Sequence, residues 1–157
     1  MKYAQDYHIV PVLAATSATG GGASAFVNAS KYQWIDFIIN IGTLTGDTMT
    51  VTVEECTGND TTAPATEQTI PFVYRQASAV GTDSLGAATT CVSTGVAIAD
   101  TDDNTLWVVS VNPASLSAGY NYVRINLTPG SSTSAEVRSA CAVMLPRYAQ
   151  ASPLSSS

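Results

Sequence analysis

Residues 32–56 read YQWIDFIINIGTLTGDTMTVTVEEC, and this stretch decides the fold. Side chains of a β-strand point alternately to its two faces, and the first half of the stretch is apolar at every second position. The predicted core set is Ile35, Phe37, Ile39 and Ile41, and the opposite face carries Trp34, Asp36, Ile38 and Asn40. After the turn TLTGD the alternation resumes, with Met49, Val51 and Val53 inward and Thr48, Thr50, Thr52 and Glu54 outward. The stretch therefore predicts two amphipathic strands.

The same two-residue period occurs along most of the chain, and no apolar segment keeps helical spacing for three turns. Further strands are expected at residues 7–13, 69–76, 89–93, 96–100, 105–111, 120–128 and 135–145. Pro11 lacks an amide donor, which favours an edge position for the first of them. The stretch SATGGGAS, residues 17–24, is predicted to be a flexible connection, and Asn112 and Pro113 are predicted to start a turn or one helical turn. We expect an all-β fold, an antiparallel β-sandwich of jelly-roll-like type in which sequence-distant strands pair.

The composition limits the classes of function. The 157 residues fit one domain, and charged residues make up 11%, against about 25% in ordinary globular proteins. Seventeen serines and twenty threonines supply much of the polar surface instead. The net charge is −6 and the six basic residues are dispersed, so no nucleic-acid partner is expected. No apolar run reaches the roughly 18 residues of a membrane span, and Asp6, His8 and Pro11 interrupt what would be the apolar core of a signal peptide.

The three cysteines do not form a metal or disulfide pattern. Cys56, Cys91 and Cys141 are an odd number without a CxxC pair. Cys141 lies in an apolar stretch, which predicts a small buried hydrophobic residue. A bridge between Cys56 and Cys91 stays open, because spacing alone cannot decide it.

Sequence features that could carry chemistry have simpler structural interpretations. The single histidine, His8, lies in a strand without a nucleophile motif, which favours a structural ring with satisfied hydrogen bonds. The glycine-rich TGGGAS lacks the Lys-Ser/Thr of a phosphate loop, and adjacent Glu54 and Glu55 should face opposite sides of a strand, which does not suit a two-carboxylate hydrolase. We therefore expect no enzyme and no cofactor.

Two binding alternatives remain. Asp100, Asp102 and Asn104 have the alternating spacing of calcium ligands but lack the rest of the EF-hand pattern, and an Asx-rich turn between strands explains them without any ion. The aromatic residues of a possible sugar-stacking platform are Trp34, Trp107, Tyr120 and Tyr122, although tryptophan in a sandwich more often lies in the core.

Four phrases resemble those of small structural proteins of tailed bacteriophages, the capsid decoration or cement proteins. They are YAQDYHIVPVLAA, residues 32–56, AGYNYVRINLT and LPRYAQASP, and together they span the chain from about Tyr3 to Pro153. The resemblance implies a sandwich on the capsid exterior, made in the host cytoplasm, that binds the major capsid protein and itself, as a homotrimer over threefold positions. A carbohydrate-binding or adhesin module, and another virion component such as a head fibre base or tail protein, remain as alternatives.

The ends of the chain are the predicted contact segments. We expect an N-terminal arm at residues 1–6, the sandwich at residues 7–146 and a C-terminal tail at residues 147–157. Residues 149–157 carry no charged side chain and cannot build a core, so they are either disordered or ordered against another chain. The contact residues expected from the resemblance are Lys2, Tyr3, Gln5, Asp6, Arg147, Tyr148, Gln150 and Pro153.

Overall fold

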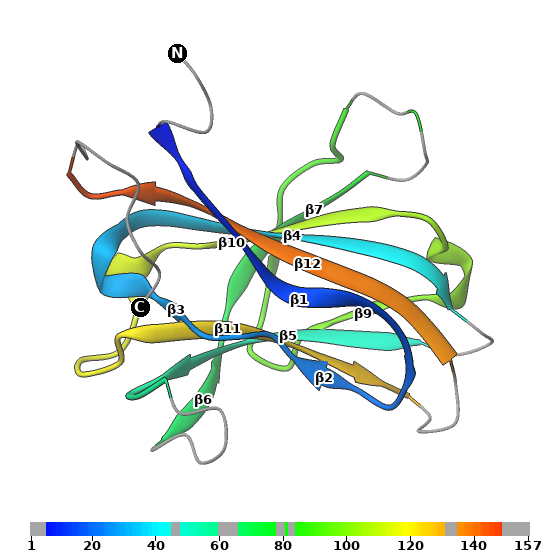
Figure 1. The fold of residues 1–157 in the computed structure, drawn as a ribbon, viewed down its shortest axis with the longest axis horizontal. Helices are drawn as coiled ribbons and strands as arrows, with labels where there is room; N and C mark the ends of the chain where they lie inside the picture. Colours follow the sequence, from blue (N-terminus) through cyan, green and yellow to red (C-terminus); the bar gives the residue numbers. More distant parts are fainter. Residues whose placement is uncertain are drawn as a thin grey trace.

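A computed structural model of the chain describes residues 6–44, 48–59, 66–77, 81, 84–130 and 135–148. Within these residues the fold is all-β, and two antiparallel sheets pack face to face (Figure 1). The predicted antiparallel β-sandwich is therefore confirmed. Of the eight predicted contact residues, Lys2, Tyr3, Gln5, Gln150 and Pro153 lie outside the described part of the chain.

The first sheet, sheet A, has six strands in the described residues. In spatial order they are β1 (His8–Thr19), β12 (Ala135–Pro146), β4 (Tyr32–Leu44), β10 (Leu106–Val111), β7 (Phe72–Ala77) and β8 (Thr89–Cys91). The strand β1 lies at the edge, as the proline at position 11 predicts.

The second sheet, sheet B, is centred on β11 (Tyr122–Pro129) and β5 (Met49–Cys56). One broken edge, β2 (Gly22–Ala23) and β3 (Val27–Asn28), pairs with β11. The other edge, β6 (Glu67–Ile70) and β9 (Val96–Ile98), pairs with β5. Short 3₁₀ turns η1 (Ala29–Lys31), η2 (Asp100–Asp102) and η3 (Pro113–Ser115) connect the strands, and the Asn112 side chain caps η3 as its sequence predicts.

The chain crosses between the sheets at most of its connections. From β1 to β5 it alternates between sheet A and sheet B, and it does so again from β9 to β12. Neighbours within a sheet are consequently far apart in sequence, and His8 in the first strand pairs with Met144 in the last. This pairing brings the two ends of the described chain to one end of the sandwich (Figure 1).

The core lies between the sheets and contains the side chains that the alternation predicts. The residues Ile35, Phe37, Ile39 and Ile41 of β4 are at most 1% exposed, and Met49, Val51 and Val53 of β5 are fully buried. The inward side of β11 adds Val123, Ile125 and Leu127. The period-two prediction is therefore confirmed for β4, β5 and β11.

The structure contradicts the sequence prediction for two segments. The stretch 17–24 is not a flexible connection, because β1 continues to Thr19 against β12 and Gly22–Ala23 pairs with β11. A Cβ atom at Gly21 would lie 2.6 Å from the Leu127 carbonyl oxygen, so the close approach requires glycine. The predicted strand 69–76 is two strands in different sheets, and Pro71, which has no amide donor, lies at the crossing.

Truncation in the core should destabilise the protein strongly. Phe37→Ala removes a fully buried ring from the centre of β4, and we expect a loss of about 3–5 kcal/mol in the free energy of unfolding. Asn40→Ala on the same strand is the control, because Asn40 is exposed and its substitution should change stability by less than about 0.5 kcal/mol. Denaturant titrations measure both, and equal losses would contradict the assigned faces.

Candidate interaction surface

The outer face of sheet A is apolar over its central strands. Because Ile35 and Phe37 point inward, Trp34 and Ile38 point outward, and Ile38 lies in register between Val108 of β10 and Cys141 of β12. Ile9 pairs with Val143, which in turn pairs with Asp36 of β4. We call eight outward apolar residues of β1, β4, β10 and β12 the sheet A face: Ile9, Pro11, Trp34, Ile38, Val108, Cys141, Val143 and Leu145. Val143 among them is only 6% exposed. Ile9 and Trp34 are 44% and 40% exposed, so large apolar side chains meet solvent here.

The polar groups inside this face are paired with one another. The Oδ1 atom of Asp36 accepts hydrogen bonds from the Trp34 indole Nε1 at 2.8 Å and from the Ser110 hydroxyl at 2.6 Å. A partner that covers the face therefore leaves neither of these two donors unsatisfied. The indole ring is also held in one orientation, which reduces the entropy lost on docking.

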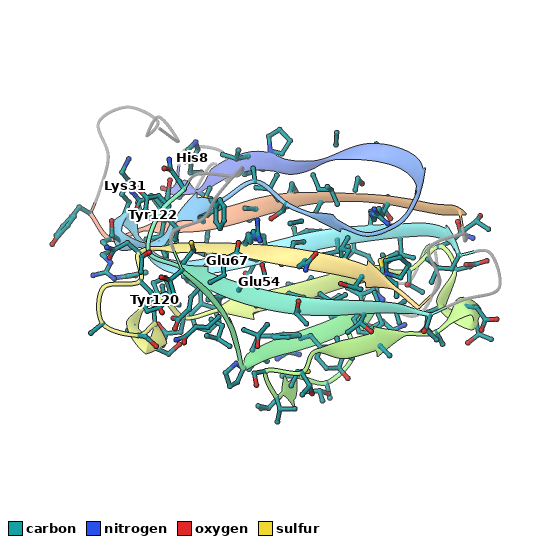
Figure 2. All side chains as sticks on the ribbon, turned by 90° about the horizontal axis from the view of Figure 1, so that it is seen from below. His8, Lys31, Glu54, Glu67, Tyr120 and Tyr122 are labelled. Atoms are coloured by element: carbon teal, nitrogen blue, oxygen red, sulfur yellow. The ribbon has the colours of Figure 1, made fainter. Side chains whose placement is uncertain are left out.

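The outer face of sheet B is polar by contrast. Threonines alternate along β5, and Arg124 of β11 donates to the Glu54 carboxylate at 2.7 Å and also pairs with Glu67 of β6. The Arg124 guanidinium lies 4.6 Å from the ring centroid of Phe26, and Asn126 donates to Glu54 at 3.2 Å. The cluster joins three strands of sheet B through polar side chains, of which Glu54 and Glu67 are labelled in Figure 2.

The neighbouring acids Glu54 and Glu55 face opposite sides, as predicted. Glu55 is fully buried, where it accepts hydrogen bonds from the Ser117 backbone amide at 2.9 Å and from the Gln68 side chain. It thereby fastens the loop after η3 to β5 and β6. Sequence reasoning missed this structural role, because the loop that supplies the amide is 62 residues away.

The single histidine contacts the hydroxyl group of a buried tyrosine. His8 Nδ1 and the Tyr32 hydroxyl are 2.7 Å apart, and burial raises the pKa of Tyr32, so the phenol stays protonated at neutral pH. The prediction of a strand histidine with a satisfied ring is confirmed. His8 lies at the end of the sandwich (Figure 2).

In the acidic loop around η2, Asp100 is exposed, and two other aspartates accept hydrogen bonds within the fold. Asp102 accepts from the Ala99 amide and the Gln76 side chain, both at 3.1 Å, while Asp103 accepts from the Leu44 amide at 2.7 Å. Asn104 has a φ of 58°, which asparagine tolerates in tight turns. The interpretation as an Asx-rich turn is thus supported by each contact. Across the described ranges no group of three or more His, Cys, Asp or Glu residues is arranged to hold a metal ion.

The three cysteines are free thiols. Cys56 belongs to sheet B and Cys91 to sheet A, and the bridge that the sequence left open is not formed. Cys141 is half-buried on the sheet A face and not in the core, because Ala140 and Ala142 occupy the inward positions of β12. Burial raises the pKa of Cys91 and Cys141, so both thiols are protonated and slow to react at neutral pH.

Thiol counting tests this arrangement. Ellman's reagent should titrate three thiols in the denatured protein without prior reduction, and the folded protein at neutral pH should react much more slowly. A count of one thiol under denaturing, non-reducing conditions would show that a disulfide exists. Cys56→Ser and Cys91→Ser would then identify its members.

The described contact residues lie together at the end where β1 begins and β12 ends. Asp6 is exposed, and Tyr148 is 78% exposed. Arg147 is fastened to the sandwich, since its amide donates to the Lys31 carbonyl at 3.1 Å and its Nε to the Tyr32 carbonyl at 2.9 Å. Their contact with a partner stays a prediction.

The four aromatic residues of the predicted sugar platform do not come together. Trp107 is buried and stacks on Tyr74 with ring centroids 5.2 Å apart, whereas Trp34 lies on the sheet A face. Tyr122 belongs to β11 of sheet B and lies at the same end of the sandwich as Tyr120 (Figure 2). The prediction of a platform formed by all four residues is therefore wrong, because they belong to different sheets.

Comparisons with known proteins add no relative. No family model, no curated protein and no solved structure matches the chain. In the described part of the chain, no helix has the length and apolar character needed to cross a membrane.

Proposed function

We propose that this protein is a structural virion protein that binds the outer surface of a tailed-phage capsid and stabilises the major capsid protein lattice. The family and the location come from the sequence resemblance. The observation that supports an adhesive role is the sheet A face, an apolar surface over the centre of a well-packed sandwich. A homotrimer over the threefold positions is the form that the resemblance implies.

We also infer that the sandwich is a jelly roll. Strands in the order β1, β12, β4, β10 face strands in the order β2/β3, β11, β5, β6, and the chain alternates between them. Such wrapping is what two interlocked Greek keys produce, with β7 and β8 as an extension of sheet A. Jelly rolls are common in viral capsid proteins and lectins, which agrees with the leading proposal and its alternative.

The sheet A face has the composition of an interface core. Trp34 and aliphatic side chains make up most of the face, and the Asp36 carboxylate lies among them. Depletion of charged groups is typical of the desolvated centre of protein contacts. Burial of apolar surface contributes about 25 cal/mol per Å², and a standard interface covers about 800 Å² of each partner. Weak contacts repeated over a capsid lattice add through effective concentration, so each copy needs only modest affinity.

The Asp36 carboxylate sets a requirement on the partner. Its Oδ1 already accepts two hydrogen bonds, and a carboxylate that loses water needs a cation or further N–H donors in exchange. We therefore expect the capsid surface under the sheet A face to present apolar side chains around an Arg, a Lys or backbone amides.

A carbohydrate-binding module is the second candidate, and Trp34 favours it. Its ring is 40% exposed and its indole N–H is held by Asp36, which leaves a rigid apolar surface for stacking on a sugar. Binding of host polysaccharides that is lost in Trp34→Ala would support this candidate over the capsid role.

Matched lysine substitutions on the two outer faces test the capsid proposal. Ile38→Lys and Thr52→Lys both change a half-buried, outward residue of a central strand, in sheet A and sheet B respectively. We expect Ile38→Lys to lose co-sedimentation with purified capsids by at least about tenfold, because it buries an ammonium in the contact. Thr52→Lys should bind as the unmodified protein does.

Particle stability provides the functional measurement. Heads assembled without the protein should rupture at a lower temperature, and adding back the Thr52→Lys variant should restore their resistance whereas Ile38→Lys should not. Heads of unchanged robustness without the protein would overturn the proposed function. Loss of capsid binding by Thr52→Lys but not by Ile38→Lys would show that the docking surface lies on sheet B.

A further inference from the structure

The edge of sheet A at β8 lacks the features that usually keep edge strands from pairing with other chains. In the described residues β8 pairs only with β7, and Thr89 and Thr90 are exposed. An edge strand presents unpaired backbone donors and acceptors, and natural proteins protect such edges with charged residues, prolines or bulges. Residues 84–99 contain neither a charged residue nor a proline. The outer edge of β8 is therefore open to a further strand.

The other edges of the two sheets carry such protection. The strand β1 contains Pro11 and two register shifts against β12, and its Val12 carbonyl already accepts the Ala25 amide at 2.7 Å. Each edge of sheet B is divided between two short strands, and β6 begins with Glu67, which pairs with Arg124. Breaks, bulges and charges of this kind oppose edge-to-edge pairing. Among the described strands, β8 is thus the edge best suited to it.

Two exposed apolar side chains flank β8. Leu85 is 42% exposed and Val92 is 64% exposed, so Val92 meets solvent more than Ile9 or Trp34 of the sheet A face. Burial of apolar surface contributes about 25 cal/mol per Å². A strand that pairs with β8 and covers these side chains therefore gains hydrophobic stabilisation in addition to backbone hydrogen bonds.

The rest of the fold holds this edge in one position. The Gly86 amide donates to the Gln76 carbonyl at 2.8 Å, and the Arg75 guanidinium donates to the Gly86 carbonyl at 3.1 Å, so the segment before β8 is attached to β7. After β8 the Gly95 amide donates to the Val92 carbonyl at 3.0 Å. Gly95 has a φ of 90°, and a Cβ atom there would lie 2.5 Å from a carbonyl oxygen of β5, so this turn packs against sheet B. An edge that is already fixed loses little entropy on pairing.

We propose that β8 pairs antiparallel with β8 of a second copy of this chain, about a two-fold axis at Thr90. The uncharged edge offers no charge pattern that a different partner could complement, whereas an antiparallel strand pair about a two-fold axis is complementary to itself. Thr90 is the central residue of β8, so it lies opposite Thr90 of the second copy. Threonine pairs on neighbouring strands stabilise a sheet.

The geometry of this contact agrees with docking through the sheet A face. Opposite residues of paired strands point to the same side of a sheet, so two copies joined at β8 present both sheet A faces on one side. Both faces can then lie on one capsid surface. The contact is distinct from the homotrimer that the resemblance implies. It does not rest on the capsid role either, because free copies can form it.

The contact is small, because β8 is three residues long. Three residues at about 3.4 Å each span about 10 Å, whereas a standard stable interface covers about 800 Å² of each partner. We therefore expect weak, reversible pairing, with a dissociation constant of about 0.1–1 mM. Repetition of such a contact on a lattice strengthens it through effective concentration.

Disulfide trapping tests the contact with Thr90→Cys and Thr69→Cys. Both place a thiol at an exposed threonine of an edge strand, in β8 of sheet A and in β6 of sheet B. Opposite Cβ atoms in an antiparallel pair are about 4.5–5.5 Å apart, near disulfide distance, so mild oxidation should link Thr90→Cys into dimers at least about tenfold faster than Thr69→Cys. The unmodified protein, with its three free thiols, gives the background. Equal rates for the two variants would overturn the proposal.

Sedimentation equilibrium provides the second arm. The mass of the unmodified protein should at least double as its concentration rises to about 1 mM, and Thr90→Lys should weaken this association by at least about tenfold, because two ammonium groups then lie opposite each other. Thr69→Lys is the matched charge control and should associate as the unmodified protein does. Ile38→Lys should do the same, because Ile38 lies on the sheet A face and not at the edge.

The remaining outcomes also decide the proposal. If circular dichroism shows that Thr90→Lys fails to fold, Val92→Lys serves instead, because Val92 is exposed beside β8. Absence of a rise in mass up to about 1 mM would overturn the proposal. Association that the lysine at the β8 edge leaves unchanged, or that only Ile38→Lys abolishes, would overturn it as well.

Discussion

The constraint on which the rest depends is that β4 carries apolar side chains on both faces, while a sandwich of two sheets covers only one. Phe37 and Ile39 fill the inner side, and Ile38 and Trp34 remain on the outer side, next to equally apolar positions of β10 and β12. Strands that are apolar on both faces are typical of sheets covered on both sides. On the outer side of sheet A, Ile9 and Trp34 remain 44% and 40% exposed, whereas Val143 is 6% exposed. The capsid contact proposed above would cover the exposed part.

The outer faces of the two sheets differ in polarity. Sheet B places threonines and the cluster around Arg124 outward, and these groups keep their hydrogen bonds in water. Its ion pairs are partly exposed and contribute little stability individually, but together they hold β11, β5 and β6 in register. The difference in polarity between the two outer faces agrees with an orientation in which sheet B faces solvent and sheet A faces the proposed capsid partner.

The sequence predicts features that depend on neighbouring residues, and it does not predict features that depend on contacts between residues far apart in the chain. The inward faces of β4, β5 and β11 follow from local alternation, which needs no knowledge of partners. The split at Pro71 and the burial of Glu55 depend on contacts from distant segments, and no local pattern carries them. The hydrogen bond from the Ala25 amide to the Val12 carbonyl likewise joins segments that no local pattern brings together. The sheet A face did have a signal, since Ile38 and Val143 are apolar at outward positions, where alternation predicts polar residues.

Under the proposed function, Asp36 explains how such a face can exist on a protein that stays dispersed until it binds the capsid. An unbroken apolar sheet surface would associate with any other apolar surface, including its own copies. A carboxylate in the middle changes this, because its burial is costly unless the partner supplies donors at that position. The cost falls on wrong partners more than on the right one, so Asp36 lowers the maximum affinity and raises the selectivity. Its hydrogen bonds to Trp34 and Ser110 fix where those donors have to be, and the apolar residues around it then determine how tightly the correct surface is held.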